Sequence, residues 1–178
     1  MNILHLMGNT GAGKTSIMDA LVARNPGACA GISVGRELRK MYPPEYFKGA
    51  AAPEHTEAEA MSLYRKFVLA NRQCALIVVD GQPRKESQVM PSLELWPGSH
   101  DFLLVHAPHN VRHERLIGRD SHDVAKMALA QSRLDADYRN QYEVMVELAR
   151  LGIHLEIVDS AKHDIQWVVE RLEERYKL

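Results

Sequence analysis

The residues best suited to chemistry lie near the N-terminus, in a glycine-rich stretch that ends in lysine and threonine. Gly8–Thr15 reads G-N-T-G-A-G-K-T and fits the pattern G-x-x-x-x-G-K-[ST] at every fixed position. Glycines let a backbone curl so that successive N–H groups point at phosphate oxygens. Lys14 would bring a mobile positive charge to the β- and γ-phosphates, and the Thr15 hydroxyl would bind Mg²⁺. The stretch therefore predicts a P-loop for ATP and Mg²⁺.

We expect the donor phosphates to contact the whole loop and the start of the helix that follows it. A helix that begins near Lys14 would place the positive end of its dipole at the phosphates. Kinases, ATPases, GTPases and motor proteins share this pattern, so the pattern leaves the reaction open. The predicted donor-binding residues in this stretch are Gly8, Asn9, Thr10, Gly11, Ala12, Gly13, Lys14, Thr15 and Ser16.

Short apolar runs alternate with helical patterns, and these elements must position the loop. The predicted strands are Ile3–Met7, Cys29–Ser33, Leu76–Asp80, Phe102–His106 and His154–Val158. The predicted helices are Lys14–Arg24, Val34–Met41, Thr56–Asn71, Asn110–Gly118, Val124–Leu151 and a last one from His163 or Asp164 to Tyr176, with Thr56 and Asn110 as caps. We expect loops at Tyr42–Glu54 and Pro91–His100. The alternation predicts an α/β fold, a three-layer αβα sandwich around a central parallel sheet of about five strands.

Length and composition set the class of protein. The 178 residues, 46% of them hydrophobic and 25% charged, are typical of one globular domain, so we expect a single domain over residues 1–178. A net charge of -1 gives no field that would attract a nucleic-acid polymer or an anionic membrane. With no signal peptide or membrane span recognisable, we expect a cytoplasmic monomer whose partners are small-molecule nucleotides. Cys29 and Cys74 lack a metal-binding spacing and are expected to be reduced thiols.

An acidic residue ends one of the predicted strands. Asp80 follows the apolar run of Leu76–Asp80, so its carboxylate would lie at the carboxyl edge of the sheet, beside the P-loop. An aspartate at that place helps to hold Mg²⁺, often through water. Its alternative role is to cap a turn or a helix. We expect Thr15 and Asp80 to form the metal site.

Arginines recur in the segments that follow the other strands. Ile32–Arg39 reads I-S-V-G-R-E-L-R, and Asp80–Arg84 reads D-G-Q-P-R with Gln88 four residues on. Arg115–Arg119 reads R-L-I-G-R, and Arg133 begins an R-L-x-x-x-Y spacing. A guanidinium fork matches phosphate oxygens two at a time, although surface arginines are the plain alternative. The pair in R-L-I-G-R would share one helix face, where a bound anion would relieve their repulsion.

Together with the P-loop, these segments resemble the adenylate kinase and nucleoside monophosphate kinase family in order and in separation. The resemblance runs from Asn2 to the end of the chain. It implies that Arg39 and Arg84 hold the acceptor phosphate and that Gln88 reads the acceptor base. It also implies that Arg115 packs on the donor adenine. The implied substrate-binding residues are Ser33, Val34, Gly35, Arg39, Gly81, Arg84 and Gln88, and the implied catalytic residues are Lys14, Arg84, Arg119 and Arg133.

The chain departs from the family pattern mainly around the acceptor. Val34 stands where adenylate kinases carry Thr, Gln82 replaces the Phe of D-G-F-P-R, and Arg36 replaces the Asp of I-S-T-G-D. Residues 41–71 would form the acceptor-nucleotide segment, and residues 120–132 leave room for only a reduced lid. The expected reaction is transfer of the γ-phosphoryl of ATP to a nucleoside or deoxynucleoside monophosphate, with adenine favoured. The alternatives are a P-loop kinase of another small molecule, such as a sugar acid or a nucleoside, and a nucleotide-binding regulatory module without turnover.

Overall fold

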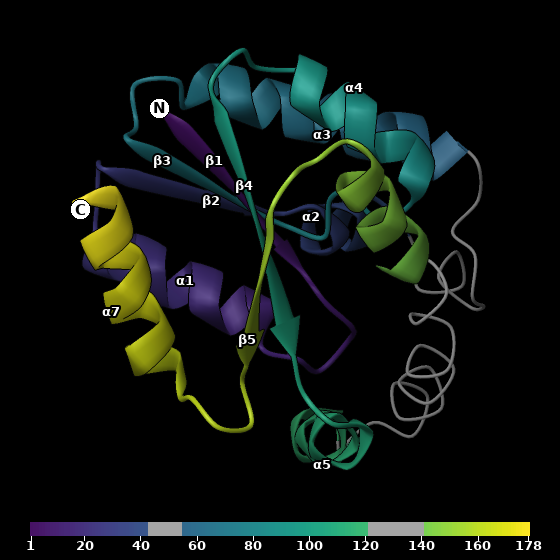
Figure 1. The fold of residues 1–178 in the computed structure, drawn as a ribbon, viewed down its shortest axis with the longest axis vertical. Coiled ribbons are helices and arrows are strands. Elements are labelled where there is room, and N and C mark those ends of the chain that lie inside the picture. The colour runs from purple at the N-terminus through teal and green to yellow at the C-terminus, as the bar shows by residue number, and fades with distance from the viewer. Residues whose placement is uncertain (43–54, 121–140) are drawn as a thin grey trace.

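A computed structural model describes residues 1–42, 55–120 and 141–178 of the chain. Parallel strands form a five-stranded sheet in the order β2-β3-β1-β4-β5. The strands are β1 (Asn2–Met7), β2 (Cys29–Ser33), β3 (Leu76–Asp80), β4 (Ser99–His106) and β5 (Leu155–Asp159). Helices cover both faces of the sheet (Figure 1), which confirms the predicted α/β sandwich.

Helices form a layer on each face of the sheet, and two more lie at the carboxyl ends of its strands. On one face lie α1 (Lys14–Arg24) and α7 (Ile165–Tyr176), and on the other lie α3 (His55–Ala70), α4 (Val89–Glu94) and the helical residues 141–150. Two further helices, α2 (Val34–Met41) and α5 (His109–Asp120), follow the carboxyl ends of β2 and β4. A short 3-10 turn, η2 (Glu86–Gln88), leads into α4. Within the described residues, no helix is long and apolar enough to span a membrane.

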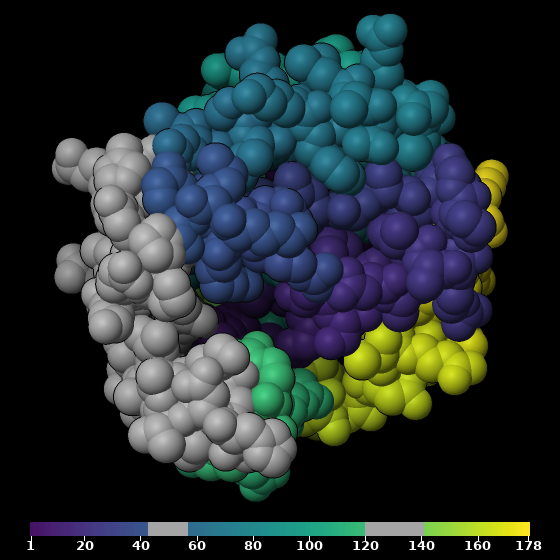
Figure 2. All heavy atoms as spheres, turned by 180° about the vertical axis from the view of Figure 1, so that it is seen from behind, coloured from purple at the N-terminus to yellow at the C-terminus, as the bar shows by residue number. Residues whose placement is uncertain are grey.

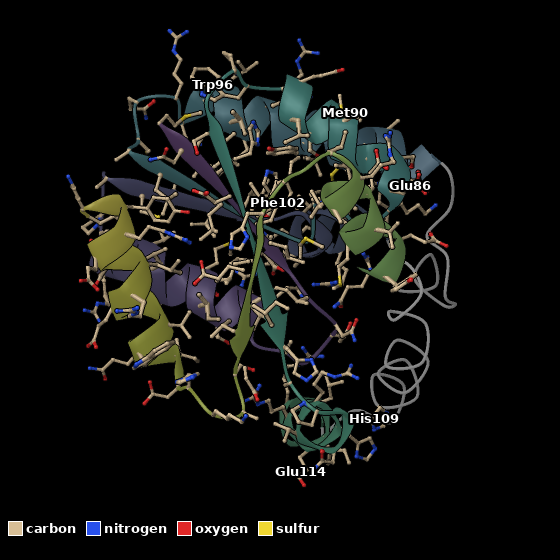
Figure 3. All side chains as sticks on the ribbon, viewed as in Figure 1. Glu86, Met90, Trp96, Phe102, His109 and Glu114 are labelled. Carbon is tan, nitrogen blue, oxygen red and sulfur yellow. The ribbon has the colours of Figure 1, made fainter. Side chains whose placement is uncertain are left out.

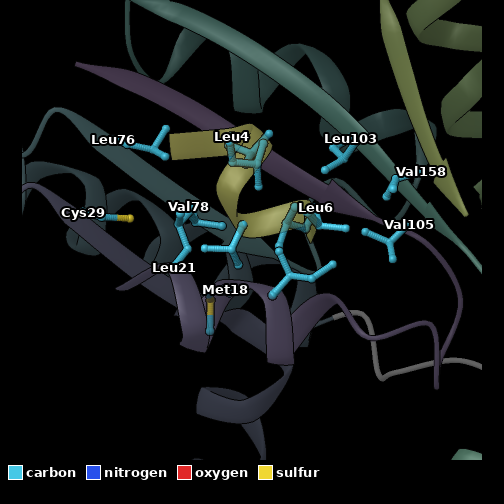
Figure 4. Packing of buried hydrophobic residues seen from close by; sticks show 14 of the residues in the cluster. Leu4, Leu6, Met18, Leu21, Cys29, Leu76, Val78, Leu103, Val105 and Val158 are labelled. Carbon is cyan, nitrogen blue, oxygen red and sulfur yellow. The ribbon is translucent and has the colours of Figure 1, made fainter. Parts of the chain in front are cut away.

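The core fills both faces of β1, because neighbouring residues of a strand point to opposite faces. Leu4 and Leu6 pack against Met18 and Leu21 of α1, as Figure 4 shows. Residues of the opposite face, beginning with Ile3, pack against α3. This two-sided burial explains why the strands read as continuous apolar runs.

Most predicted elements are confirmed, some of them to the residue, but one predicted loop and both predicted helix caps are wrong. Thr56 does not cap α3, because that helix already includes His55. Pro91–His100 is not a loop, because α4 includes Pro91 and β4 begins at Ser99, where it pairs with the start of β1. Pro91 lies in the first turn of α4, where a missing N–H breaks no intrahelical hydrogen bond. Asn110 does not cap α5, because the carbonyl of Pro108 accepts the N–H of Arg112.

Other predictions are affected by the limits of the described chain. Residues 43–54 of the predicted loop, and residues 124–140 of the predicted long helix, lie outside the described residues.

Both cysteines are buried and free. Burial, and then the charge of Cys74, raises the pKa of the Cys29 thiol to about 12, so this thiol is protonated at neutral pH.

Candidate active site

The P-loop connects β1 to α1 and has the backbone that its glycines allow. Gly8, Gly11 and Gly13 have φ angles of 132°, 82° and 100°. A Cβ on Gly8 would lie 2.2 Å from the carbonyl oxygen of Val105 in β4, and a Cβ on Gly11 would lie 2.9 Å from the Arg112 carbonyl oxygen. Glycine is therefore required at these two positions both by the backbone and by the space around it.

The ammonium group of Lys14 lies on the loop itself. Its Nζ donates to the carbonyl oxygens of Gly8 at 2.6 Å and Asn9 at 3.1 Å. Asn9 is buried, and its Oδ1 is one of the buried side-chain oxygens that have no hydrogen-bond partner among the described residues. The cradle thus concentrates a cation and backbone groups in a space suited to a phosphate chain.

Asp80 meets the P-loop helix at the carboxyl edge of the sheet. Its carboxylate is nearly buried, and Oδ2 accepts hydrogen bonds from the hydroxyls of Thr15 and Ser33. The structure therefore brings the two predicted metal ligands together. Their oxygens suit Mg²⁺, which prefers hard oxygen ligands. The Ser33 hydroxyl, expected on the acceptor, instead contacts Asp80 at 3.0 Å and orients its carboxylate.

The R-L-I-G-R arginines lie on α5, beside the P-loop. Arg115 donates through Nη1 to Oγ of Ser160, at 3.0 Å, and through Nη2 to the carbonyl oxygen of Ser160, at 2.6 Å. Its Nη1 also lies 3.4 Å from the carbonyl oxygens of Gly11 and Ala12. Arg115 therefore joins the P-loop to the turn after β5. Arg119 is exposed in the last turn of α5, and Arg133 lies outside the described residues.

A third arginine of α5 was missed by sequence reasoning. Arg112 is fully buried, and it donates through Nε to the carbonyl of Ala107 at 3.1 Å and through Nη1 to the carbonyl of Thr10 at 3.3 Å. A single arginine in a helix looks like a surface residue. The available signal was its position three residues before Arg115, which places both on one face of the helix. The two arginines attach α5 to the outer carbonyls of the P-loop.

Removal of the Arg112 guanidinium should weaken donor binding. We expect Arg112→Met to reduce the affinity for Mg²⁺·ADP by about tenfold, because the Thr10 carbonyl of the P-loop loses its charged donor and about 1–3 kcal/mol of hydrogen bonding. Isothermal calorimetry measures the change. The exposed Glu114 of the same helix, labelled in Figure 3, provides the control variant Glu114→Ala, which should bind normally. A folded Arg112→Met protein with unchanged affinity would contradict the assignment.

The predicted acceptor residues gather where β2 and β3 end. A Cβ on Gly81 would lie 4.0 Å from the backbone nitrogen of Gly35, and a Cβ on Gly35 would lie 3.4 Å from Nη1 of Arg39. The Arg39 guanidinium therefore lies beside Gly35, and Gly35 lies near Gly81, the residue that follows Asp80. Val34 is different, because its side chain is 1% exposed and packs in the core under this edge. Its side chain is closed to a substrate in this structure.

The loop that carries Arg84 is held by Gln88. The Oε1 atom of this buried glutamine accepts the backbone N–H groups of Arg84 at 2.8 Å and Lys85 at 3.3 Å. Oε1 is therefore engaged with the loop, and the amide nitrogen is the end of Gln88 suited to reading a base. Lys85 forms an ion pair with Glu57 of α3, which ties this loop to the helix that covers it. Arg84 itself is exposed.

The space around these residues forms a hollow. Figure 2 shows dark purple atoms of the N-terminal segment at the bottom of this hollow and green atoms of α5 at its rim. A cleft of about 650 Å³ lies beside the edge strand β2 and is lined by residues that include Val22, Ser33 and Phe67. Neither the P-loop nor Arg84 lines that cleft, so we place the candidate site at the hollow.

One solved structure gives the comparison that matters for the fold. A gluconokinase from Sinorhizobium meliloti 1021 is similar over 98% of this chain and 94% of that chain, with a TM-score of 0.59. The two chains share the P-loop αβα sandwich fold. The sequence identity is 20%, so the likeness shows this fold and neither the reaction nor the substrate. No protein-family model matches the chain, and no curated protein matches it.

Proposed function

We propose that the protein is an ATP-dependent kinase that transfers the γ-phosphoryl group to a nucleoside or deoxynucleoside monophosphate. The proposal depends on one observation: two exposed arginines, Arg39 and Arg84, follow adjacent strands that end at Ser33 and at the buried Asp80. Guanidinium groups bind phosphate in preference to neutral hydroxyls. A pair of them next to the metal site suits an acceptor that already carries an ionised phosphate.

The donor half of the site fits Mg²⁺·ATP. Thr15 and Asp80 would hold the ion, with Ser33 orienting the carboxylate. The bound ion supplies charge neutralisation on the donor phosphates. Lys14 would leave the carbonyls of Gly8 and Asn9 and bind phosphate oxygens in their place.

Positioning accounts for most of the catalysis in this proposal. An ionised acceptor phosphate needs no general base, so the protein has to align two anions and offset the charge of the moving phosphoryl group. Arg39 and Arg84 would align the acceptor, while Lys14 and Arg119 would offset the charge, together with Arg133 as the sequence resemblance implies. Adenine is the favoured base in this proposal, as the sequence resemblance implies through Gln88, whose side chain contacts the loop of Arg84.

A kinase of a sugar acid is the second candidate, favoured by the likeness to a gluconokinase. A neutral hydroxyl acceptor needs a carboxylate base. Two carboxylates close to the acceptor edge are already paired, Asp19 with Arg36 at 2.6 Å and Glu57 with Lys85. Arg36 stands where the nucleotide kinase pattern has an aspartate. Its guanidinium pairs with Asp19 of α1 and also lies within electrostatic reach of Asp80. These pairings favour the anionic acceptor.

An assay of all ribo- and deoxyribonucleoside monophosphates and gluconate, with ATP and Mg²⁺, tests the proposal. We expect a nucleoside diphosphate product, and we expect Arg84→Ala to raise the KM of the acceptor by about 10–100-fold, the value of a charged hydrogen bond. Arg36→Ala, which removes an arginine from the same edge, should change that KM by less than about threefold, as for an exposed ion pair. Phosphorylation of gluconate alone would support the sugar-acid kinase. Binding of ATP without any product would support a regulatory module.

A further inference from the structure

Two histidines lie in contact on the face of the sheet that α3 covers. His5, in the middle of β1, is 0% exposed, and its ring stacks on Phe102 of β4 with centroids 4.5 Å apart. The ring of His100, on the same strand as Phe102, is nearly parallel to that of His5, with centroids 5.3 Å apart. Figure 3 shows Phe102 near the centre of the sheet and Trp96 before the start of β4. His5 is therefore a core residue, while the partly buried His100 reaches the surface.

The ring nitrogens form a continuous chain of contacts between two loops. His5 Nδ1 lies 3.1 Å from the carbonyl oxygen of Gln82, and His5 Nε2 lies 3.0 Å from His100 Nδ1. His100 Nε2 lies 2.9 Å from the carbonyl oxygen of Trp96. All three distances are those of hydrogen bonds. The chain joins the loop of Arg84 to the segment before β4.

The number of protons in this chain follows from the chemistry of its ends. A carbonyl oxygen only accepts, so His5 Nδ1 and His100 Nε2 must each carry a proton. The contact between the rings needs a third proton. Two neutral imidazoles carry only two protons in total. We infer that His5 and His100 hold one extra proton between them, and that this proton completes the chain that fixes the Gln82 carbonyl beside Arg84.

The surroundings decide where that proton resides. Burial, and then the charge of His100, lowers the pKa of His5 to about 3, so His5 is neutral with its proton on Nδ1. His100 then carries both ring protons and donates to His5 and to Trp96. The other titratable group that faces His5 is Tyr64 of α3, which burial keeps neutral by raising its phenol pKa. Among the described residues, no carboxylate hydrogen-bonds either ring, so carbonyl oxygens and His5 solvate the cation.

The dependence of stability on pH counts the protons directly. In the unfolded chain both histidines take up a proton below their ordinary pKa of about 6.5. The native pair holds one, so the unfolded state binds one more proton and stability falls as the pH falls from about 6 towards 4. Relative to the His5→Gln/His100→Gln variant, the folded-to-unfolded ratio should fall about tenfold per pH unit. All other titrating groups cancel in this comparison.

Urea unfolding between pH 4.5 and 5.5 measures that slope. A relative loss of about a hundredfold per pH unit would mean an uncharged native pair, and no relative loss would mean a doubly charged one. Either result would overturn the inference.

Nuclear magnetic resonance of the unaltered chain gives a second test, which remains decisive if the double variant does not fold. At pH 5 the His100 ring should show two protonated nitrogens, and the His5 ring should show a proton on Nδ1 alone. The backbone amides of Gln82 and Arg84 should shift as the pair loses its proton. One bare nitrogen on each ring at pH 5 would refute the shared proton. Neither test uses turnover, so both are independent of the proposed kinase activity.

Discussion

Lys14→Ala is expected to abolish most of the phosphoryl transfer while the protein remains folded. In the structure the Lys14 ammonium lies against the P-loop carbonyls, at the place where a phosphate chain would bind. It would bind non-bridging oxygens whose charge changes during transfer. Loss of one such donor typically lowers kcat by about 10²–10³-fold. We therefore expect a fall in kcat of roughly a hundredfold or more, measured with saturating ATP and acceptor.

A matched control separates this effect from a general loss of positive charge. Lys66 is an exposed lysine of α3, far along the chain from the P-loop. Lys66→Ala should have normal turnover, and thermal unfolding of both variants should resemble that of the unaltered protein. Near-normal kcat in Lys14→Ala would show that the P-loop lysine does not serve the reaction.

Gly8→Ala is expected to damage the fold itself. Gly8 has a φ of 132°, a backbone conformation that costs other residues about 1–3 kcal/mol. The added Cβ would also lie 2.2 Å from the Val105 carbonyl oxygen, so β1 and β4 would have to separate at the centre of the sheet. With about 1–3 kcal/mol more for this overpacking, we expect a total loss near 4 kcal/mol in the free energy of unfolding, measured in urea.

Variants at two other glycines separate the cost of the positive φ from the cost of the contact with Val105. Gly27 has a φ of 82° but no atom within 4 Å of an added Cβ, so Gly27→Ala should cost only about 1–2 kcal/mol. Gly118 lies in α5 with the same open space and no positive φ, so Gly118→Ala should stabilise the protein by about 0.5–1 kcal/mol. Equal losses for Gly8→Ala and Gly27→Ala would mean that the contact with Val105 is not limiting.

The local elements could be read from the sequence because their causes are local. The runs of β2 and β3, and the helices α1 and α2, were predicted to the residue. Two boundaries were wrong for different reasons. β4 begins at Ser99 because a distant partner, the start of β1, pairs with it. α4 includes Pro91 because a proline is compatible with a first helical turn.

The residues of the candidate site that belong to a sequence motif could be predicted. The P-loop and the pairing of Thr15 with Asp80 follow from spacing, since both lie at carboxyl ends of parallel strands. The contacts of Arg112 and the role of Ser33 were not predictable, because each depends on which backbone atom or carboxylate lies beside it in space.

The sequence by itself determined the α/β alternation, the phosphate cradle and the set of arginines, because periodicity, glycine content and charge act over a few neighbouring residues. Only the tertiary structure decided which groups meet. It buried Val34, attached Arg115 to Ser160, and joined His5 to His100 across strands that are 95 residues apart at these positions. The physical reason is that strand order selects the neighbours of each side chain, and burial then determines which of them keep their protons.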